Sequence, residues 1–248
     1  NGKTGQLFTI DENTGVLSAA AELDREVHGD KIDVTVCAVQ STQNSPKASC
    51  TEVSIAVTDL NDTPPKFSRN MYTETVSEGT GIGTGVATVT VTDPDTVGQV
   101  SLVIKSGADG KFRIDNTGKI TLTATLDRET KARHTLVIEA SDGIQTSTTS
   151  VIVTVSDIND SPPAFTSLLY TFDVPEDSPV GTTLGRVEAV DPDEGLGGEV
   201  YYTLTSTWGS DLFNLDLQKG TFTLLGNLDF EEVQLYTLKV TAEDRGDP

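Results

Sequence analysis

The sequence has no apolar run approaching the roughly 18 residues that a membrane-spanning helix needs. It begins at Asn1, with neither an initiator methionine nor a secretory apolar segment, so we expect a piece of a longer protein. Histidine and cysteine occur only twice each. No EF-hand loop, Gly-x-Ser-x-Gly motif or phosphate-cradling glycine loop is found. The common signatures of hydrolytic and nucleotide-binding sites are therefore missing.

Basic residues are also scarce. The chain has 17 lysines and arginines against 38 aspartates and glutamates, a net charge of −21. A nucleic acid or an anionic membrane surface would be repelled, whereas cations are natural ligands. The hydrophobic share of 35% and the 22 glycines are close to those of ordinary globular domains. The acidity therefore belongs to folded domains and not to a disordered tail.

Long stretches of helical periodicity are missing too, and alternation of apolar and polar residues dominates instead. It predicts strands over 53–57, 135–140, 150–155, 201–205 and 236–242. Turn sequences such as Asp11–Gly15 and Asp115–Gly118 separate such segments. The pattern predicts an all-β protein made of tandem β-sandwiches.

A set of acidic motifs recurs with a period of about one hundred residues, which is the length of a domain. Asp24, Asp127 and Asp229 open the three copies of a Leu-Asp-x-Glu motif, and Asp-x-Asn-Asp precedes Pro64-Pro65 and Pro162-Pro163. We call these two proline-marked segments the first and the second joint. The boundaries predict domains over 1–62, 63–160 and 161–248. Only the middle one is expected to be complete, the first lacking its opening strands and the third its last strand.

The acidic residues gather at the joints. If each motif is extended, Asp24 with Glu26, Asp127 with Glu129, and Asp93 with Asp95 present two carboxylates to one face. For the second joint the candidate ligands are Glu78, Asp127, Glu129, Asp157, Asn159, Asp160, Asp191, Asp193 and Asp244. This all-oxygen set favours calcium, which accepts many oxygens in flexible geometry, over magnesium or zinc.

The acidic motifs also allow other interpretations. Any single acidic motif is more often a turn or a solvated face than a ligand, but repetition in order at both joints favours the metal site. Paired carboxylates also serve glycosidases, yet a catalytic site is normally single, so we expect no enzyme. His28 and His134 are expected at the surface or in turns. Trp208 would be a sugar platform in a carbohydrate-binding array, although a loop tryptophan more often packs against its own domain.

Cys37 and Cys50 flank a loop rich in serine, glutamine and asparagine, as partners in a hairpin would. The spacing favours a disulfide, and with it an oxidising compartment, over two buried free thiols.

Taken together, these motifs resemble those of the cadherin superfamily, in particular internal repeats of a multi-repeat, non-classical or protocadherin-like member. The shared signatures are a first-strand glutamate, Asp-Arg-Glu, Asp-x-Asn-Asp-x-Pro, Asp-x-Asp and a late aspartate, and they cover essentially the whole chain. The resemblance implies seven-strand Greek-key β-sandwiches and three calcium ions at each complete joint.

Carried over to this sequence, the resemblance implies further ligands. At the first joint they are Asp24, Glu26, Asp59, Asn61, Asp62, Asp93, Asp95 and Asp142. Backbone oxygens would come from Leu60, Thr63, Ile158, Ser161 and Gly197. A partial outgoing site would hold Glu176, Asp229 and Glu231.

The departures from the family pattern are informative. Gln40 stands where the late aspartate is expected, so the joint preceding the first module would lose a charged ligand. Asn61-Asp-Thr63 and Asn159-Asp-Ser161 are glycosylation sequons, but a following proline and the use of both asparagines as ligands argue against glycosylation.

The resemblance also implies a function: an extracellular segment of a plasma-membrane protein that calcium stiffens for adhesion. Its partner would be another cadherin ectodomain, homophilic or heterophilic, and it would reach the membrane only through parts outside this chain. A tension-bearing tether and a non-adhesive ligand- or carbohydrate-binding receptor array are the alternatives.

Overall fold

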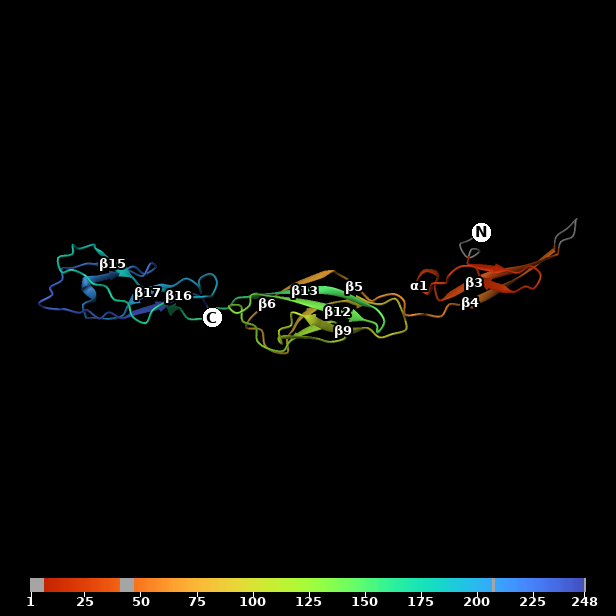
Figure 1. Ribbon diagram of the computed structural model, residues 1–248, viewed down its shortest axis with the longest axis horizontal. Helices are drawn as coiled ribbons and strands as arrows, with labels where there is room; N and C mark the ends of the chain where they lie inside the picture. The colour runs from red at the N-terminus through yellow and green to blue at the C-terminus, as the bar shows by residue number, and fades with distance from the viewer. Residues whose placement is uncertain (1–6, 41–46, 207, 248) are drawn as a thin grey trace. The chain divides into compact units, whose positions relative to one another are not determined.

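The computed structural model describes residues 7–40, 47–206 and 208–247 (Figure 1). In chain order its elements are β1 (Phe8–Ile10), β2 (Leu17–Ala19), α1 (Arg25–His28), β3 (Lys31–Gln40), β4 (Lys47–Ala56), β5 (Lys66–Phe67), β6 (Met71–Ser77), β7 (Gly85–Thr88), β8 (Val91–Thr92), β9 (Ser101–Ser106), β10 (Phe112–Ile114), β11 (Lys119–Leu122), β12 (Arg133–Ser141), β13 (Thr146–Ser156), β14 (Ala164–Phe165), β15 (Thr183–Arg186), β16 (Ala189–Val190), β17 (Tyr201–Leu204), a 3-10 helix (Ser210–Leu212), β18 (Phe213–Leu215), β19 (Thr221–Leu224) and β20 (Val240–Glu243). Among these residues no helix has the length and apolar character that crossing a bilayer requires.

The chain divides into two compact units. Unit 1 comprises Asn1–Tyr72, Gly85–Thr121 and Thr135–Ile152, and unit 2 comprises Thr73–Thr84, Leu122–His134 and Val153–Pro248. Strands β6, β12 and β13 each run from one unit into the other. All candidate ligands of the first joint fall in unit 1, and all those of the second joint fall in unit 2. Each joint can therefore be described within a single unit.

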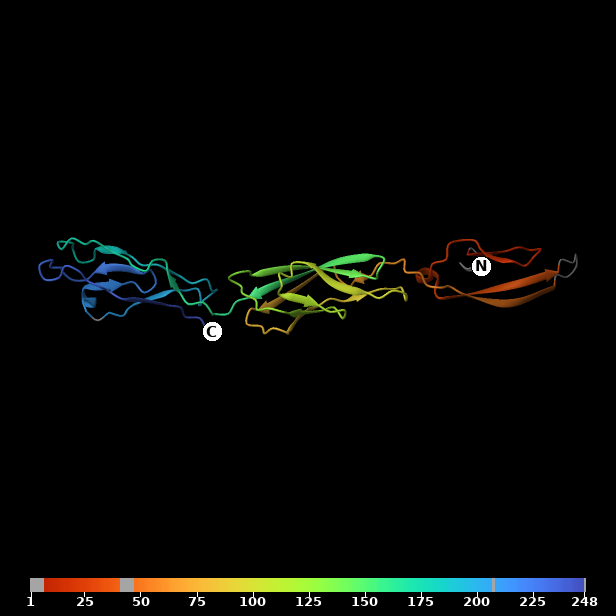
Figure 2. The ribbon, with the colours of Figure 1, turned by 60° about the horizontal axis from the view of Figure 1, so that its bottom comes forward.

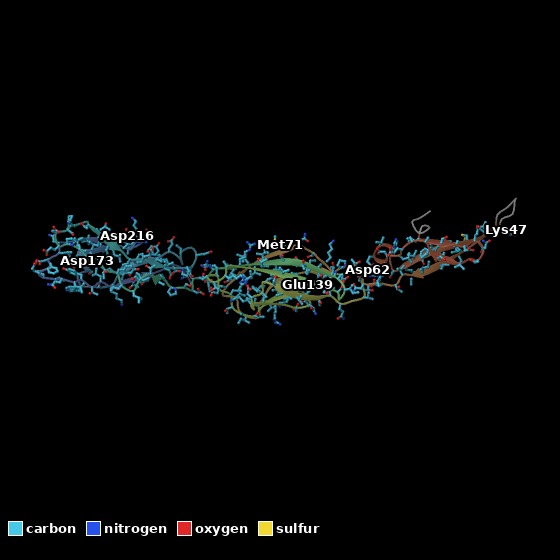
Figure 3. The ribbon with its side chains drawn as sticks, in the orientation of Figure 1. Lys47, Asp62, Met71, Glu139, Asp173 and Asp216 are labelled. Atoms are coloured by element: carbon cyan, nitrogen blue, oxygen red, sulfur yellow. A yellow bond between two sulfur atoms is a disulfide. The ribbon has the colours of Figure 1, made fainter. Side chains whose placement is uncertain are left out.

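In unit 1 the short antiparallel pair β1-β2 and the helix α1 precede a long antiparallel ribbon of β3 and β4, which Figure 2 shows side by side. Its register pairs Cys37 directly with Cys50, and the two sulfurs form a disulfide, as predicted. The residues between β3 and β4 lie outside the described part of the chain. A connecting segment that contains Asp62 then leads from β4 to β5 (Figure 3).

Strands β6 to β13 form a four-stranded sheet in the order β6-β13-β12-β9 and a three-stranded sheet in the order β10-β11-β7, with a small β5-β8 pair beside them. One face of β12 and β13 is buried in strict alternation, because successive side chains of a strand point to opposite sides. These buried residues are His134, Leu136, Ile138, Ala140, Thr149, Val151, Val153 and Val155. The predicted strands over 135–140 and 150–155 are thus confirmed.

His134 corrects one expectation, since its side chain is 1% exposed and not at the surface. It stands two residues before Leu136, so the alternation of β12 turns it inward. His28 lies at the end of α1, where its Nδ1 is 2.9 Å from the carbonyl oxygen of Asp24. It is the last residue of this single helical turn and is half-buried.

The later part of unit 2 repeats this plan with a three-stranded sheet, β15-β19-β18, and the pairs β17-β20 and β14-β16. Its core is formed by Val187, Ala189, Tyr202, Phe213, Phe222 and Leu224. The predicted strand over 236–242 is wrong in its first half, because β20 begins only at Val240. The Lys239 carbonyl still accepts from the N–H of Thr205 at 2.9 Å, but the Lys239 N–H donates to the Ser206 hydroxyl, which interrupts the ladder.

Both predicted turns are present. The carboxylate of Asp115 accepts the N–H of Thr117 at 2.9 Å and the N–H of Lys119 at 3.1 Å. Gly118 has a φ of 84°, the left-handed conformation in which a side chain would be strained. Asp11 closes the other turn by accepting the N–H of Thr14 at 2.8 Å.

Candidate metal centre

The first joint brings together carboxylate oxygens of Glu26, Asp59 and Asp95, all within 4.8 Å of one another. Glu26 comes from α1, Asp59 from the segment after β4, and Asp95 from the Asp-Pro-Asp turn after β8. Oδ2 of Asp95 accepts the N–H groups of Asp62 at 3.0 Å and Thr63 at 2.9 Å, which fixes the carboxylate against the connecting segment.

Asp24 and Glu26 do not lie along one extended strand, which corrects the expected geometry: the backbone of Asp24 is extended, but Glu26 is in α1. Asp24 is the N-cap of α1, and its Oδ1 accepts the N–H of Val27 at 2.8 Å. An aspartate at this position satisfies an N–H that would otherwise have no helical partner. The motif therefore builds a helical turn that carries Glu26.

Asp59 is the most heavily hydrogen-bonded carboxylate of this joint. The hydroxyl of Thr96, the guanidinium of Arg25 at 2.7 Å and the N–H of Val97 at 3.0 Å all donate to it. The Thr96 hydroxyl bond is the largest of the effects that hold the pKa of Asp59 far below its usual value. This group stays ionised under any physiological condition, as a cation ligand requires.

Asn61 and Asp142 lie on another side of the first joint. The Asn61 side-chain oxygen faces only acceptors, and turning the amide over would place its nitrogen 3.1 Å from Oδ2 of Asp142 and 3.2 Å from Oδ2 of Asp95. Three oxygens that face one another suit a shared cation. Gly98 has a φ of 94°, and a Cβ there would lie 2.8 Å from the Asn61 amide nitrogen and 3.1 Å from the Asp142 carbonyl oxygen, so a side chain at this position would be strained. Gly98 is a site-shaping residue that the motif search missed.

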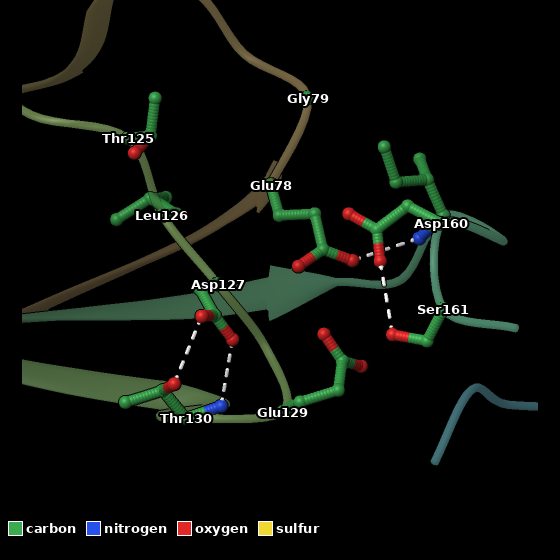
Figure 4. A pocket seen from close by; sticks show the side chains of 10 residues that line it. Glu78, Gly79, Thr125, Leu126, Asp127, Glu129, Thr130, Asp160 and Ser161 are labelled. Atoms are coloured by element: carbon green, nitrogen blue, oxygen red, sulfur yellow. Dashed lines mark hydrogen bonds between the residues drawn. The ribbon is translucent and has the colours of Figure 1, made fainter. Parts of the chain in front are cut away.

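The second joint contains two overlapping clusters, each with oxygens within 4.8 Å: Glu78, Glu129 and Asp160, and then Glu129, Asp157 and Asp193. Glu129 belongs to both. Figure 4 shows the first cluster in a pocket, with the carboxylates of Glu78, Glu129 and Asp160 directed toward one another. The arrangement offers two neighbouring cation positions that share one glutamate.

Glu78 is 5% exposed, and hydrogen bonds to two separate segments hold its carboxylate. Oε2 accepts the N–H of Arg128 at 2.7 Å, and Oε1 accepts the N–H of Ile158 at 2.9 Å. The end of β6 is thereby tied both to the Asp-Arg-Glu turn and to the segment after β13.

The second joint repeats the correction found at the first. Asp127 accepts the N–H and the hydroxyl of Thr130, both at 2.8 Å, so it caps a turn and does not lie extended beside Glu129 (Figure 4). Within Asp-Pro-Asp the first aspartate accepts the N–H of the second at 3.0 Å, in both Asp93–Asp95 and Asp191–Asp193. Side chain to backbone bonds, and not strand alternation, set the directions of these carboxylates.

A third group surrounds Asn159. Its Nδ2 donates to Oδ1 of Asp244 at 2.9 Å. A Cβ at Gly197 would lie 2.4 Å from Oδ1 of Asn159, and one at Gly246 would lie 2.6 Å from its Cγ, so both glycines allow the backbone to approach closely. Burial, followed by the charges of Asp193 and Asp244 among others, raises the pKa of Asp191. Like charges are therefore crowded here.

Four oxygens at the joints are buried and have no hydrogen-bond partner within the described part of the chain. They are Oδ1 of Asp95, Oδ1 of Asn159, Oδ2 of Asp191 and Oδ1 of Asp193. Unsatisfied buried oxygens are costly, so each one calls for a partner. All four belong to the predicted ligand set.

The pKa values of Asp157 and Glu129, at the second joint, are shifted in opposite directions. Burial opposes ionisation of Asp157, but the N–H of Glu194 and the guanidinium of Arg128 outweigh it and lower the pKa. Glu129 has a raised pKa, chiefly through burial and with a contribution from Glu78. Burial and the neighbouring Glu78 therefore disfavour the ionised form of Glu129, the glutamate that both clusters share.

The remaining predicted positions are placed as follows. The N–H of Ser161 donates to Asp193 at 3.0 Å. Leu60 is 69% exposed, on the connecting segment of the first joint. Glu176, Asp229 and Glu231 form a separate exposed cluster, in which Glu176 accepts the N–H of Phe230 at 2.7 Å. Trp208 stacks on Tyr236 with ring centroids 5.3 Å apart, so it packs against its own domain.

The chain is similar to known proteins over nearly its whole length. A family model described as "Cadherin domain" matches residues 72–156 and 170–248. The chain is 39% identical to mouse Protocadherin Fat 4 over 245 residues, 98% of this chain and 5% of that protein. It is also 39% identical to mouse Cadherin-9 over 255 aligned positions, 97% of this chain and 32% of that protein. The chain thus spans a small part of these curated relatives.

Solved structures show the same fold. The crystal structure of mouse Cadherin-23 EC22-24 matches with a TM-score of 0.83 and 29% identity, covering 97% of this chain and 78% of that one. Protocadherin Gamma B2 extracellular cadherin domains 1-5 match with a TM-score of 0.75 and 30% identity, covering 96% and 47%. The predicted class of β-sandwich repeats is confirmed.

Proposed function

Because the chain belongs to the cadherin family, we propose that it is an extracellular spacer segment whose two joints bind calcium and are stiffened by it. Three ions are proposed for each complete joint, held by the ligand set predicted from the sequence. The proposed repeats are 1–62, 63–160 and 161–248. Cadherin repeats bind calcium in general, and the acidic clusters of this chain lie where those motifs are.

One observation carries the proposal: the buried, unpartnered oxygens of Asp95, Asn159, Asp191 and Asp193. A cation would satisfy these oxygens, and an all-oxygen donor set selects a hard one. The number of positions also supports three ions at the second joint. Two overlapping carboxylate clusters share Glu129, and the group of Asn159, Asp191 and Asp244 forms the third.

Repulsion between the carboxylates of each joint explains why calcium would stiffen it. Two carboxylates a few ångströms apart repel by about 1 kcal/mol even in a water-like dielectric. Bound calcium would cancel that repulsion and crosslink the Asp-Arg-Glu turn, the connecting segment and the Asp-Pro-Asp turn. Extracellular modules typically bind calcium with dissociation constants on the order of 10⁻⁴ to 10⁻³ M.

Adhesion, with another cadherin ectodomain as partner, is the function we propose for the protein that contains this segment. In that protein the segment would lie outside the plasma membrane, and Asn61 and Asn159 would serve as ligands and not as glycosylation sites. The disulfide between Cys37 and Cys50 fits an oxidising compartment. Bead aggregation that requires calcium would support adhesion.

Small-angle scattering with and without millimolar calcium tests the joint mechanism. The radius of gyration and maximum dimension should change with calcium in the wild-type chain. The change should shrink in a double variant, Asp191→Asn with Asp193→Asn. A control, Asp173→Asn with Asp216→Asn, removes the same charge from residues outside the ligand set (Figure 3). Scattering curves that do not depend on calcium would count against the proposal.

A further inference from the structure

We propose that Arg128, and Arg25 at the first joint, act as a cationic latch that holds each joint together when calcium is scarce and competes with calcium for the same carboxylates. This inference rests on the proposed function, because it assigns those carboxylates to calcium. It gives the middle residue of Asp-Arg-Glu a role of its own, that of a positioning residue.

The side chain of Arg128 is 12% exposed and contacts four groups at once. Its Nε donates to Asp157, and its Nη2 contacts Glu129. The same Nη2 donates to the carbonyl oxygen of Pro192 at 2.6 Å. Nη1 lies 3.4 Å from Oε1 of Glu194. One guanidinium thus joins the Asp-Arg-Glu turn, the segment after β13 and the Asp-Pro-Asp turn.

Arg25 repeats the same pattern in an independent part of the chain. Its Nε donates to Asp59 at 2.7 Å, and its Nη2 lies 2.6 Å from Glu26. Nη2 also donates to the carbonyl oxygen of Pro94 at 2.8 Å. The partners are in both cases the motif's own glutamate, the first aspartate of Asp-x-Asn-Asp and the proline of Asp-Pro-Asp. Because the same set of partners recurs at two sites, the arrangement follows from the motif and is not a chance surface pair.

The chemistry of the groups that Arg128 contacts explains both why it would compete with calcium and why it would hold the joint together without calcium. Asp157 and Glu129 belong to the candidate calcium cluster, so a guanidinium bound to them is a competing cation. The Pro192 carbonyl is neutral and lies outside the proposed ligand set, so its bond to Arg128 ties the two turns together whether or not the carboxylates bind an ion. The planar guanidinium of arginine spreads five N–H donors in fixed directions and so spans oxygens that lie apart, whereas the compact ammonium of lysine has three donors on a single nitrogen.

The third copy of the motif separates the backbone role from the side-chain role. Phe230 replaces the arginine in Leu-Asp-Phe-Glu, yet its N–H still donates to Glu176, as the N–H of Arg128 does to Glu78. The local turn therefore forms without a guanidinium. The arginine side chain adds a link that the turn itself does not need.

Three variants of the full chain test the latch. Arg128→Met keeps an unbranched apolar stem and removes the charge and the donors, Arg128→Lys keeps the charge, and Arg186→Met is the matched control. Arg186 pairs with Glu188 at 2.5 Å on an exposed part of unit 2, so its loss changes the net charge equally.

Calcium affinity is measured by isothermal titration calorimetry. Flexibility of the calcium-free joint is measured by double electron–electron resonance between labels at Val103→Cys and Leu217→Cys, since Cys37 and Cys50 are disulfide-bonded.

Arg128→Met should bind calcium at the second joint about three- to tenfold more tightly, because a positive charge near the ions is removed. In EDTA its label-to-label distance distribution should broaden. Arg128→Lys should broaden the distribution equally while its affinity stays within about twofold of wild type, since charge dominates the competition. Arg186→Met should change neither quantity.

An unchanged calcium-free distribution in Arg128→Met, or calcium binding weaker than wild type, would overturn the latch. The calcium-free measurement does not depend on calcium binding. If the wild-type chain bound no calcium, the proposed function would fail while the distance distributions would still decide whether Arg128 ties the two turns together.

Discussion

Glu78 accepts a hydrogen bond from the backbone N–H of Arg128 at 2.7 Å, and the same bond joins Glu176 to Phe230. The residue that donates differs between the two copies, but the bond is kept because it uses only the backbone. This glutamate therefore supports the Asp-x-Glu turn through hydrogen bonding, in addition to any role as a ligand. The other oxygen of Glu78 accepts the N–H of Ile158.

Glu78→Gln should weaken both functions of this residue. An amide has one acceptor oxygen, so its NH₂ group would face one of the two N–H donors, leaving a buried donor unsatisfied. We expect a loss of about 1–3 kcal/mol in the free energy of unfolding, measured by urea denaturation in EDTA. Calcium affinity at the second joint should also fall, measured by titration calorimetry.

Glu74→Gln is the control, since Glu74 is an exposed residue of β6, the strand that ends just before Glu78. It should leave both the unfolding midpoint and the calcium affinity near their wild-type values. A Glu78→Gln protein as stable as wild type in EDTA would show that the two backbone bonds contribute little.

Gly197→Ala should disturb the second joint through Asn159. The added methyl group would lie 2.4 Å from Oδ1 of Asn159, closer than any normal contact, so the amide must move. The group of Asn159, Asp191 and Asp244 would then lose its geometry, and titration calorimetry should show the loss of about one ion from the stoichiometry of the second joint. Gly81→Ala is the matched control, because a Cβ there meets no atom within 4 Å and its φ is not positive. An unchanged stoichiometry would show that Asn159 is not a ligand.

The repeated motifs predicted which segments would meet, and the structure brings Glu78, Glu129 and Asp160 together as the motif order implied. The directions of the side chains could not be predicted in the same way. The expectation for Asp127 and Glu129 used the alternation of an extended strand, but Asp127 bonds to Thr130, three residues on. Short acidic side chains compete for nearby N–H groups, and a motif alone does not reveal which N–H wins.

The burial of His134 and the role of Gly98 could both have been predicted from the sequence. His134 continues the alternation of Leu136 and Ile138 and so belongs to the buried face of β12. Gly98 follows the first Asp-Pro-Asp at about the distance at which Gly197 follows the second, which could have marked it. The late start of β20 had no such signal, because a tertiary bond from the Lys239 N–H to the hydroxyl of Ser206 interrupts the ladder there.

The disulfide between Cys37 and Cys50 should stabilise the β3–β4 ribbon. The two residues are 13 apart in the sequence, and closing a loop of that size is worth about 3 kcal/mol on the chain-entropy model. Replacing both cysteines by serine should therefore raise the hydrogen-exchange rates of β3 and β4 amides, measured by mass spectrometry. Treatment with a reductant should bring the wild-type rates to those of the variant and leave the variant unchanged. Equal rates in oxidised wild type and variant would contradict the expectation.

Acidity should affect the calcium-free protein through Asp191 and Glu129, whose pKa values are raised in the folded state by burial first and by neighbouring carboxylates. Carboxyl groups with raised pKa values take up protons in the folded state before they do so in the unfolded state. The folded state then binds more protons, so their contribution to stability increases as the pH falls from neutrality through the folded pKa values. Groups with lowered pKa values, such as Asp157 and Asp142, act in the opposite direction, but only near and below their ordinary value of 3.8.

Comparison with Asp191→Asn isolates this effect, because the other titrating groups are common to both proteins. At neutral pH in EDTA the variant should be the more stable of the two in urea denaturation, since it lacks a charge crowded by Asp193 and Asp244. The difference should shrink as the pH is lowered from neutrality, because Asp191 itself then becomes neutral in the folded wild type. In excess calcium the order should reverse at neutral pH, because the carboxylate then stabilises a bound ion that the amide holds less well. A variant less stable than wild type in EDTA at neutral pH would mean that the charge of Asp191 is satisfied by the protein alone, and the electrostatic argument for a cation at this position would fail.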